Sequence, residues 1–426
     1  MFEISVGRAG EAVKRQDRPG HFKGQYLGHD MDPSSNLNLI PVHRTGQLTG
    51  HIMAIDFDLH IGTAAPELVA LLTRAEALAE KLQALPVSAK LRRSLDRLNI
   101  SRAVRGTTGI EGIEVTEEEA ARILETPADR PVLPQTRAQT EHEVRNAALA
   151  MEDIATTLRE EPGKPVTEAV ISRIHRLLTD GVLYEHNIPG VYRSHAVTVG
   201  RYSPPRTRNA IERLMPAYIR WLNGPARGLH PIVRAIAAHF YLVSIHPFGD
   251  GNGRTSRGVE SWILYQAGLN VLGFYSLSNH YYNHHAEYIR CLEQIQTGTT
   301  RDLTGFVVFG VGGFVSELEE MWDLALNDLT IGAFERHARA LLIEQSRLHA
   351  KTGERLYALA TGLIEETPVS AIQDGTHRLG RLYRRLSDKT LARDIAYLRE
   401  RRLIVIHEGV ARANLDLVRS GDDALA

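Results

Sequence analysis

The residues that could carry out chemistry lie in one short segment, His246-Pro247-Phe248-Gly249-Asp250-Gly251-Asn252-Gly253-Arg254-Thr255-Ser256-Arg257. Gly251 and Gly253, on either side of Asn252, would let backbone N–H groups approach phosphate oxygens, because no side chain intervenes. A helix that begins there would add the positive end of its dipole. Arg254 and Arg257 lie three residues apart on one face of that helix, so both guanidinium groups can reach one polyphosphate. The segment therefore suits a nucleoside triphosphate.

Two further side chains of this segment add acid–base and metal chemistry. The imidazole of His246 can remove a proton from an incoming hydroxyl, because histidine ordinarily titrates near neutral pH. The carboxylate of Asp250 is a hard oxygen ligand, and Mg²⁺ commonly takes one carboxylate together with phosphates and waters. The alternative is a flexible glycine turn followed by a solvated basic helix face. The presence of a base, a metal ligand, a phosphate cradle and two cations together favours the nucleotide interpretation.

This segment resembles the complete signature of the Fic domain family, His-x-Phe-x-Asp/Glu-Gly-Asn-Gly-Arg-x-x-Arg. The specified positions are matched by His246, Phe248, Asp250, Gly251, Asn252, Gly253, Arg254 and Arg257. Similarity to the family extends over roughly Glu143 to Phe309. The resemblance implies a mostly α-helical core that moves AMP from ATP onto a Tyr, Thr or Ser hydroxyl of a target protein or of the chain itself.

The resemblance also implies a role for each residue of the signature. His246 would be the base and Asp250 the Mg²⁺ ligand, so the expected cofactors are ATP and Mg²⁺. Asn252 and the amides of Gly251 and Gly253 would cradle the α- and β-phosphates. The two arginines, Arg254 and Arg257, would clamp the β- and γ-phosphates.

A second motif lies far upstream, at Thr107-Thr108-Gly109-Ile110-Glu111-Gly112. It resembles the inhibitory helix, with the pattern Ser/Thr-x-x-x-Glu-Gly/Asn, that some members of the family carry. The resemblance implies that Glu111 pairs with Arg257 and keeps the γ-phosphate out of its productive place, while Thr107 begins the motif. The alternative is that Glu111 is a surface residue. Glycines inside a helix weaken it by about 1 kcal/mol each relative to alanine, and we expect Gly106, Gly109 and Gly112 to make this helix easy to release.

The segment from Ser194 to Arg208 alternates apolar residues and then turns through glycine and two prolines, which predicts a short β-hairpin. By resemblance, Val197, Thr198 and Val199 on this flap would pair with an extended stretch of the target protein. Tyr281, Tyr282 and Tyr288 lie where family members wall the adenine pocket, although the usual Arg-x-x-Tyr-Tyr pattern is altered here.

Composition limits the remaining function classes. The chain has 426 residues, a formal net charge of −1 and 43% hydrophobic residues, as expected of a folded protein. The single cysteine, Cys291, excludes an internal disulfide and indicates a reducing compartment. Residues 1–20 have no apolar core of a signal peptide, and no run is long enough to span a bilayer. We therefore expect a cytoplasmic protein without a membrane partner.

Four regions are expected from the changes in pattern. They are a strand-bearing or irregular lobe over 1–65, a helical region with the inhibitory helix over 66–130, the Fic-type catalytic core over 131–330, and a winged helix-turn-helix domain over 331–426. In the last region, helical patterns over 334–351 and 354–361 precede an N-capped helix from Ser387 and two strands, Leu403 to His407 and Arg412 to Val418. Residues 378–402 hold nine basic and three acidic side chains, a possible phosphate-facing patch.

These observations leave three functions open. The first is a self-inhibited protein adenylyltransferase. The second is removal of AMP, or transfer of another phosphate-containing group, by the same site. The third is a regulator that binds DNA through the winged helix; such modules also serve as protein-docking or dimerisation surfaces, so a homodimer is an alternative.

Overall fold

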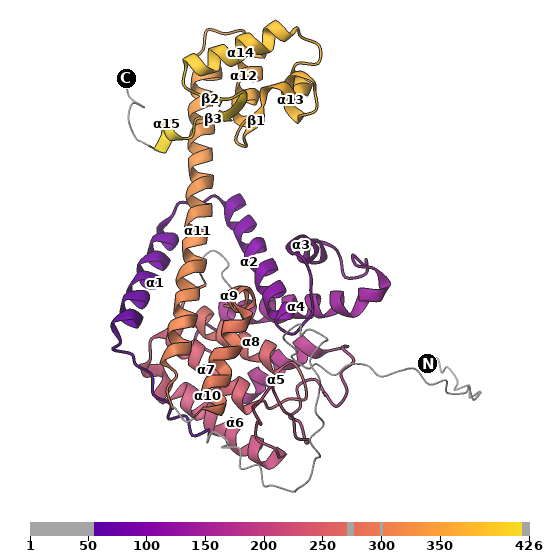
Figure 1. The fold of residues 1–426 in the computed structure, drawn as a ribbon, viewed down its shortest axis with the longest axis vertical. Coiled ribbons are helices and arrows are strands. Elements are labelled where there is room, and N and C mark those ends of the chain that lie inside the picture. Colours follow the sequence, from indigo (N-terminus) through magenta and orange to yellow (C-terminus); the bar gives the residue numbers. More distant parts are fainter. Residues whose placement is uncertain (1–54, 271–276, 299–300, 420–426) are drawn as a thin grey trace, which may run out of the picture.

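The protein is described by a computed structural model that covers residues 55–270, 277–298 and 301–419. Most of these residues are helical, as the sequence predicts (Figure 1). The helices up to the long connecting helix are α1 (Pro66–Ala84), α2 (Ala89–Gly109), α3 (Glu117–Glu125), α4 (Ala138–Glu160), α5 (Glu168–Thr179), α6 (Arg208–Asn223), α7 (Pro231–Ile245), α8 (Asn252–Gln266), α9 (Ser278–Asn283), α10 (His285–Thr297) and α11 (Thr304–Arg339), with short 3₁₀ turns at Gln135–Arg137 and Pro225–Gly228.

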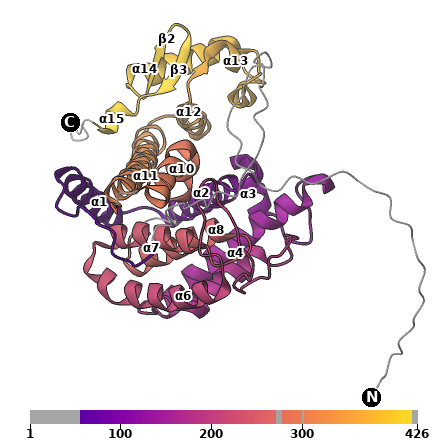
Figure 2. The ribbon, with the colours of Figure 1, turned by 60° about the horizontal axis from the view of Figure 1, so that its bottom comes forward.

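Helices α7 and α8 form the centre of the larger part of the molecule and pack against each other (Figure 2). Almost every side chain of α7 is buried, because its sequence is apolar on all faces. Helix α8 is flanked by α4 and α5, while α1 packs on α11 and α2 packs on α9. The loop between α7 and α8 is therefore held between two buried helices, and this is the segment in which the sequence predicts the chemistry.

The sequence signals for helix ends agree with the structure at several points. Thr116 and Glu119 form a capping box at the start of α3. Thr167 caps α5 by accepting a hydrogen bond from the Val170 N–H. Pro66 stands in the first turn of α1, where its missing N–H costs nothing.

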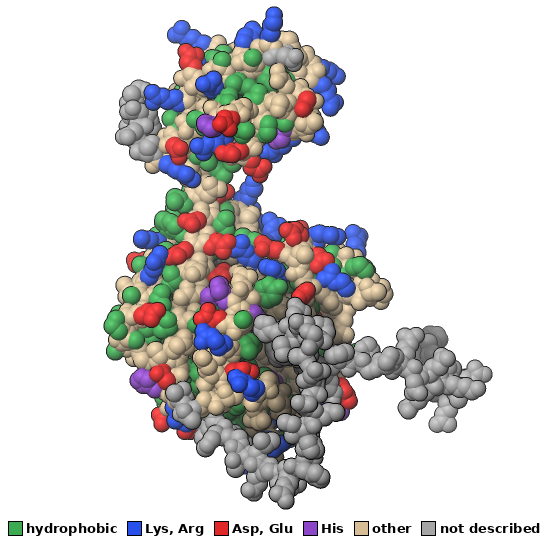
Figure 3. All heavy atoms as spheres, viewed as in Figure 1, with side chains coloured by type: hydrophobic (Ala, Val, Ile, Leu, Met, Phe, Trp, Pro, Cys, Tyr) green, Lys and Arg blue, Asp and Glu red, His purple; other side chains and the backbone are tan. Residues whose placement is uncertain are grey.

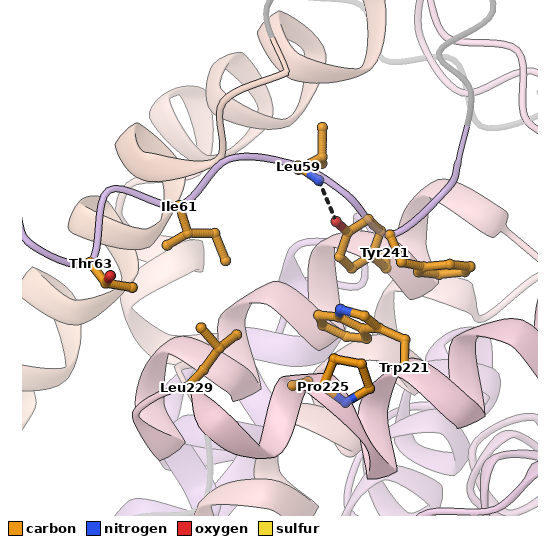
Figure 4. Close-up of a pocket in the computed structure, with 9 residues that line it drawn as sticks. Leu59, Ile61, Thr63, Trp221, Pro225, Leu229 and Tyr241 are labelled. Carbon is orange, nitrogen blue, oxygen red and sulfur yellow. Dashed lines mark hydrogen bonds between the residues drawn. The ribbon is translucent and has the colours of Figure 1, made fainter.

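Residues 55–65 form an extended strap across the core. The Leu59 N–H donates to the Tyr241 hydroxyl at 3.1 Å, and His60 forms an isolated parallel bridge with Asp302. Beneath the strap lies an apolar cavity of about 290 Å³ that Trp221 and Leu229 help to line (Figure 4). Of the strand-bearing lobe expected over 1–65, residues 1–54 lie outside the described part of the chain, and the rest contributes this single bridge.

A second, smaller unit follows α11. It contains a π-helical turn at Ala340–Glu344, α12 (Ala350–Gly362), β1 (Thr367–Pro368), α13 (Val369–Gln373), a 3₁₀ turn at Arg378–Leu382, α14 (Asp388–Glu400), β2 (Ile404–His407), β3 (Val410–Ala413) and α15 (Asp416–Arg419). The strands form one antiparallel sheet in the order β1-β3-β2. This order of helices and strands agrees with the expected helix from Ser387 and the expected two-stranded hairpin, and the assignment as a winged helix stays a prediction.

Two expectations for this unit are wrong in detail. The helical pattern predicted over 334–351 is divided, because α11 ends at Arg339 and α12 begins only at Ala350. The second strand was expected over 412–418, but β3 runs from Val410 to Ala413. Glu408 and Gly409 both have positive φ and form a two-residue turn that pairs His407 with Val410, so the strand starts directly after the turn.

Helix α11 belongs to both hydrophobic clusters of the molecule. Its residues up to Ala325 pack in the larger cluster, and those from Phe334 onward pack in the cluster of the C-terminal unit. The expected boundary at 330/331 falls between these two residues and stays a prediction. Among the described helices, none combines the length and the apolar character that a bilayer crossing requires.

Candidate active site

The loop between α7 and α8 is shaped by two left-handed residues. His246 ends α7 with φ of 50°, and Gly251 precedes α8 with φ of 71°. A Cβ on Gly251 would lie 2.8 Å from Thr179 Cγ2, so this position requires glycine both for its backbone angle and for space. The loop thus places the His246 imidazole and the first turn of α8 on the same side of the core.

The ring of His246 has a defined tautomer. Its Nδ1 lies 3.1 Å from the Val243 carbonyl oxygen, which can only accept a hydrogen bond, so Nδ1 carries the proton and donates. Among the residues that the structure describes, none bonds to Nε2, which keeps its lone pair. Burial lowers the pKa of His246 to about 4, against a weaker opposing effect of the Val243 hydrogen bond. At neutral pH the imidazole is therefore neutral and able to accept a proton at Nε2.

Arg193 fixes the backbone of this base, and the sequence reasoning did not single it out. Its Nε donates to the His246 carbonyl oxygen at 2.8 Å. Its two terminal nitrogens donate to the carbonyl oxygens of His195 (2.6 Å) and Pro205 (2.7 Å), at either end of the flap. One buried guanidinium thereby ties the base to the predicted target-binding segment.

The interior of the loop is clipped by Asn252 and by an aromatic stack. The Asn252 side-chain oxygen accepts from the Phe248 N–H at 2.9 Å, and its nitrogen donates to the Phe248 carbonyl oxygen at 3.0 Å. The Phe248 ring stacks on His175, with centroids 3.7 Å apart. The Asn252 side chain therefore holds the loop around Phe248, and the phosphate-cradle role expected for it stays a prediction.

The first turn of α8 presents an anion site through its backbone. The N–H groups of Gly253 and Arg254 have no acceptor within the described residues, as is usual for the start of an α-helix. A Cβ on Gly253 would come within 2.3 Å of Glu111 Oε1. The carboxylate of Glu111 therefore lies directly over this turn.

Arg254 is held by a buried network that no short motif identifies. Its Nη1 pairs with Glu143 Oε2 at 2.6 Å, and its Nη2 lies 2.9 Å from Asp250 Oδ2 and 3.1 Å from the Tyr184 hydroxyl. Tyr184 also donates to Glu143. Arg254 therefore orients Asp250 through Nη2, while its buried Nε has no hydrogen-bond partner among the described residues.

The carboxylate of Asp250 lies at the mouth of the loop, with its side chain 38% exposed. Burial raises its pKa, while Arg254 acts in the opposite direction. No group of three or more histidine, cysteine or carboxylate side chains that could hold a metal occurs in the described ranges. A cation here would therefore be held by Asp250 together with non-protein ligands such as phosphate oxygens and water, which is the arrangement that Mg²⁺ accepts.

Arg257 is held by the upstream motif, as the sequence predicts. Its Nη2 lies 2.7 Å from Glu111 Oε1 and 3.0 Å from the Thr107 carbonyl oxygen, and its Nε donates to the Thr107 hydroxyl at 2.9 Å. Burial acts to raise the pKa of Glu111, but Arg257 and Arg254 outweigh it and the pKa is lowered. Glu111 is therefore an anion at neutral pH, next to Arg257 and over the first turn of α8.

Gly106 and Gly109, two glycines of α2, have a packing reason that the sequence did not reveal. Gly112 lies beyond the end of α2 and so does not weaken that helix. A Cβ on Gly106 would lie 2.5 Å from the Ser278 carbonyl oxygen, and one on Gly109 would lie 2.3 Å from the Tyr282 ring. Both glycines thus allow α2 to approach α9 closely. Glu111 itself follows the last residue of α2, Gly109, in a turn.

The flap is less regular than a hairpin of two full strands. Val199 and Tyr202 exchange two backbone hydrogen bonds of 2.9 Å and form an isolated antiparallel bridge. The backbone of Val197 and Thr198 makes no hydrogen bond within the described ranges, which leaves it able to pair with another strand.

Two of the tyrosines expected near the adenine are core residues instead. Tyr281 and Tyr288 are buried, and their hydroxyls bond to Glu260 and His239, respectively. Tyr282 packs against α2, with Arg105 over its ring at 4.9 Å.

Comparison with known proteins gives this site a family context. Residues 165–264 match the family model described as Fic/DOC family. Over 163 residues, 38% of this chain, the sequence is 35% identical to the protein adenylyltransferases Fic of Drosophila ananassae and Drosophila melanogaster. The match covers 31% and 32% of those proteins, so this chain spans about a third of the length of the curated relatives it matches. A Fic family protein from Desulfovibrio desulfuricans has the same fold, with a TM-score of 0.52 and 20% identity over 82% of this chain and 96% of that chain.

Proposed function

We propose that the chain is a self-inhibited protein adenylyltransferase, which moves AMP from ATP to a Tyr, Thr or Ser hydroxyl of a target protein or of itself; the match of residues 165–264 to the Fic/DOC family model supports this. The observation that carries the proposal is the His246 Nε2 lone pair beside an unpaired helix N-terminus and a buried arginine. A base, an anion site and a cation are the groups that transfer of a phosphoryl-containing group requires.

The proposed reaction needs no reactant other than ATP and the acceptor hydroxyl. The hydroxyl oxygen of the target bonds to the α-phosphorus, and its proton passes to Nε2 of His246. The bond from the α-phosphorus to the bridging oxygen breaks, and pyrophosphate leaves. The N–H groups of Gly253 and Arg254 would stabilise the charge on the phosphates, and Arg257 would hold the γ-phosphate.

Asp250 would hold Mg²⁺ in this scheme. When bound, the ion would neutralise phosphate charge and orient the triphosphate. The protein itself provides a second carboxylate, that of Glu143, which forms an ion pair with Arg254. If Asp250 turns toward a cation, Arg254 keeps a buried ionic partner, so no unpaired charge is left in the core.

Self-inhibition would arise at Arg257. The Glu111 carboxylate occupies both the guanidinium and the space above Gly253, and it competes with phosphate as one anion with another. Transfer then requires that the end of α2 move away. The backbone of Val197, Thr198 and Val199 would bind an extended stretch of the target and bring its hydroxyl toward His246.

His246→Ala tests the proposed chemistry. We expect labelled ATP to give AMP-modified protein with the parent chain, and the variant to lose transfer by roughly 10² to 10⁴-fold, because a positioned base contributes about that factor. ATP binding should persist, since the imidazole takes no part in holding the phosphates. Mass spectrometry of modified peptides measures transfer, and calorimetry measures ATP binding. Equal transfer by the variant and the parent would exclude His246 as the base.

A further inference from the structure

Basic side chains gather on the outer side of the C-terminal unit (Figure 3). All nine arginine and lysine residues between 378 and 402 are exposed, namely Arg378, Arg381, Arg384, Arg385, Lys389, Arg393, Arg399, Arg401 and Arg402. In the part of the chain that the structure describes, Arg401 alone among them pairs with a carboxylate, Glu400 at 3.6 Å. Surface charges of one sign that lack partners repel one another, so this surface is suited to a polyanion.

Of the three acidic residues of α14, Asp388, Asp394 and Glu400, the middle one does not neutralise this surface. Asp394 is buried and accepts two hydrogen bonds from Arg355, at 2.7 and 3.2 Å, and one from the Tyr383 hydroxyl at 2.8 Å. It therefore fixes α14 on α12 from the inside. The Asp394 carboxylate therefore does not compensate the positive charge of the outer surface.

The exposed face of α14 has side chains that would allow the helix to enter a groove of a nucleic acid. Lys389, Ala392, Arg393, Ala396 and Arg399 recur at helical spacing on that face, and all are exposed. The opposite face, with Leu391, Ile395 and Leu398, is buried in the C-terminal cluster. The two alanines are short, so the helix backbone can approach a surface closely between the longer basic side chains. Figure 1 shows α14 at the end of the molecule farthest from α7 and α8.

Further basic groups flank this helix on one side. A groove of about 730 Å³ lies between α12 and residues 381–386, and its lining includes Lys351, Arg381, Arg384 and Arg385. The β2–β3 hairpin follows α14 directly in the chain and carries the exposed Arg412. The flanking arginines could contact phosphates while α14 lies between them.

We propose that the C-terminal unit binds double-stranded DNA, with α14 in the major groove and the surrounding arginines on the phosphate backbone. The major groove of B-form DNA is about 12 Å wide and admits an α-helix. The major groove of A-form RNA is too narrow for side chains to read, so the geometry favours DNA over duplex RNA. This binding is separate from the transfer reaction and holds whether or not the chain transfers AMP.

The test uses the full chain and a fluorescent duplex of about 20 base pairs. Fluorescence anisotropy at about 50 mM and about 200 mM salt should show a loss of affinity of about a hundredfold, as expected for about four phosphate contacts. The double variant Lys389→Ala/Arg393→Ala should bind about tenfold more weakly and show a salt slope shallower by about 2. The double variant Arg213→Ala/Arg220→Ala is the matched control, because it removes two exposed arginines from one face of α6.

The proposal is supported if the duplex binds with this salt dependence, the α14 variant is weakened and the α6 variant is unchanged. It is overturned if the parent shows no affinity for the duplex at the lower salt concentration. It is also overturned if both double variants bind like the parent, or if polyglutamate or duplex RNA of equal charge binds as tightly as DNA. Both variants change exposed residues only, and equal melting temperatures of all three proteins would confirm that the fold is retained.

Discussion

At the residue scale, one carboxylate lies over the candidate anion site. Glu111 lies 2.7 Å from Arg257 and directly above Gly253, and Thr107 adds two hydrogen bonds to the same guanidinium. The pKa of Glu111 is lowered, so the group that ATP would displace is charged at neutral pH. Replacing Glu111 with glycine would remove the carboxylate that competes with phosphate. The groups proposed to bind the phosphates would stay in place.

We therefore expect Glu111→Gly to raise AMP transfer, including modification of the chain itself. A charge-assisted hydrogen bond contributes about 1.5 to 3 kcal/mol, and about 1.4 kcal/mol corresponds to a tenfold change in an equilibrium. Loss of the pair should then activate transfer by roughly ten- to a hundredfold. Incorporation of labelled AMP at saturating ATP measures the effect.

Arg257→Ala separates release of inhibition from catalysis. This variant also frees Glu111, but it removes the proposed γ-phosphate clamp, so transfer should stay low. If Glu111→Gly and the parent transfer AMP equally, the pair does not inhibit, and its role is to hold α2 on the core.

The candidate site was predictable from the sequence where a residue acts through its own side chain within a short motif. His246, Asp250 and Arg257 are such residues. Arg193 was missed because it acts through backbone carbonyl oxygens, and the one at His246 is brought to it only by the fold. Glu143 was missed as a partner of Arg254 because only the packing of α4 against α8 brings the two together.

At the element scale, the contact between α2 and α9 decides where Thr107 and Glu111 lie. Helix α2 reaches α9 so closely that Gly106 faces the backbone of Ser278, and backbone cannot move aside as a long side chain can. The neighbouring residue, Thr107, makes two of the bonds to Arg257. A displacement of α2 at Gly106 should therefore also displace the contact of Thr107 with Arg257, which we propose to be part of the inhibition.

Gly106→Ala distinguishes close packing from simple helix weakness. If the glycine only weakened α2, alanine would stabilise the helix by about 1 kcal/mol and tighten inhibition. The structure predicts the opposite, because an added methyl group at 2.5 Å from the Ser278 oxygen must push the helices apart. Overpacking of this kind costs about 1 to 3 kcal/mol. We expect a lower melting temperature together with increased AMP transfer.

Ser94→Ala is the matched control for this prediction. Ser94 is exposed on the same helix, so alanine there improves helix propensity without a clash. The melting temperature of this variant should equal that of the parent or be slightly higher. Its rate of AMP transfer should equal that of the parent. A Gly106→Ala protein that melts higher than the parent and transfers less AMP would contradict the packing explanation.

Elements were predicted most reliably where an apolar period and an end signal coincide, as in the helix after Ser387. The predicted strand over 412–418 was misplaced for a different reason. Its register depends on the turn at Glu408 and Gly409 and on where β2 begins, and these pairings lie outside the strand's own sequence. Beyond β3, Asn414 bonds back to Leu403 and Arg402, which ends the strand.

At the scale of the whole molecule, a single helix of 36 residues connects two hydrophobic clusters. Ala325 is the last residue of α11 in the larger cluster, and Phe334 is the first residue of α11 in the smaller cluster. All the proposed catalytic and inhibitory residues belong to the larger part. A cluster that has its own buried side chains can unfold on its own when few contacts join it to its neighbour.

A chain that ends after Thr330 should therefore keep both its stability and its regulated transfer. It lacks every residue of the smaller cluster and retains every described residue of the larger one. Differential scanning calorimetry of the full chain should show two transitions, and the shortened chain should lose one and keep the other at the same temperature. AMP transfer by the shortened chain, with and without Glu111→Gly, should match that of the full chain in the absence of DNA. A single transition in the full chain, or loss of inhibition on shortening, would mean instead that α11 couples the C-terminal unit to α9 and α2.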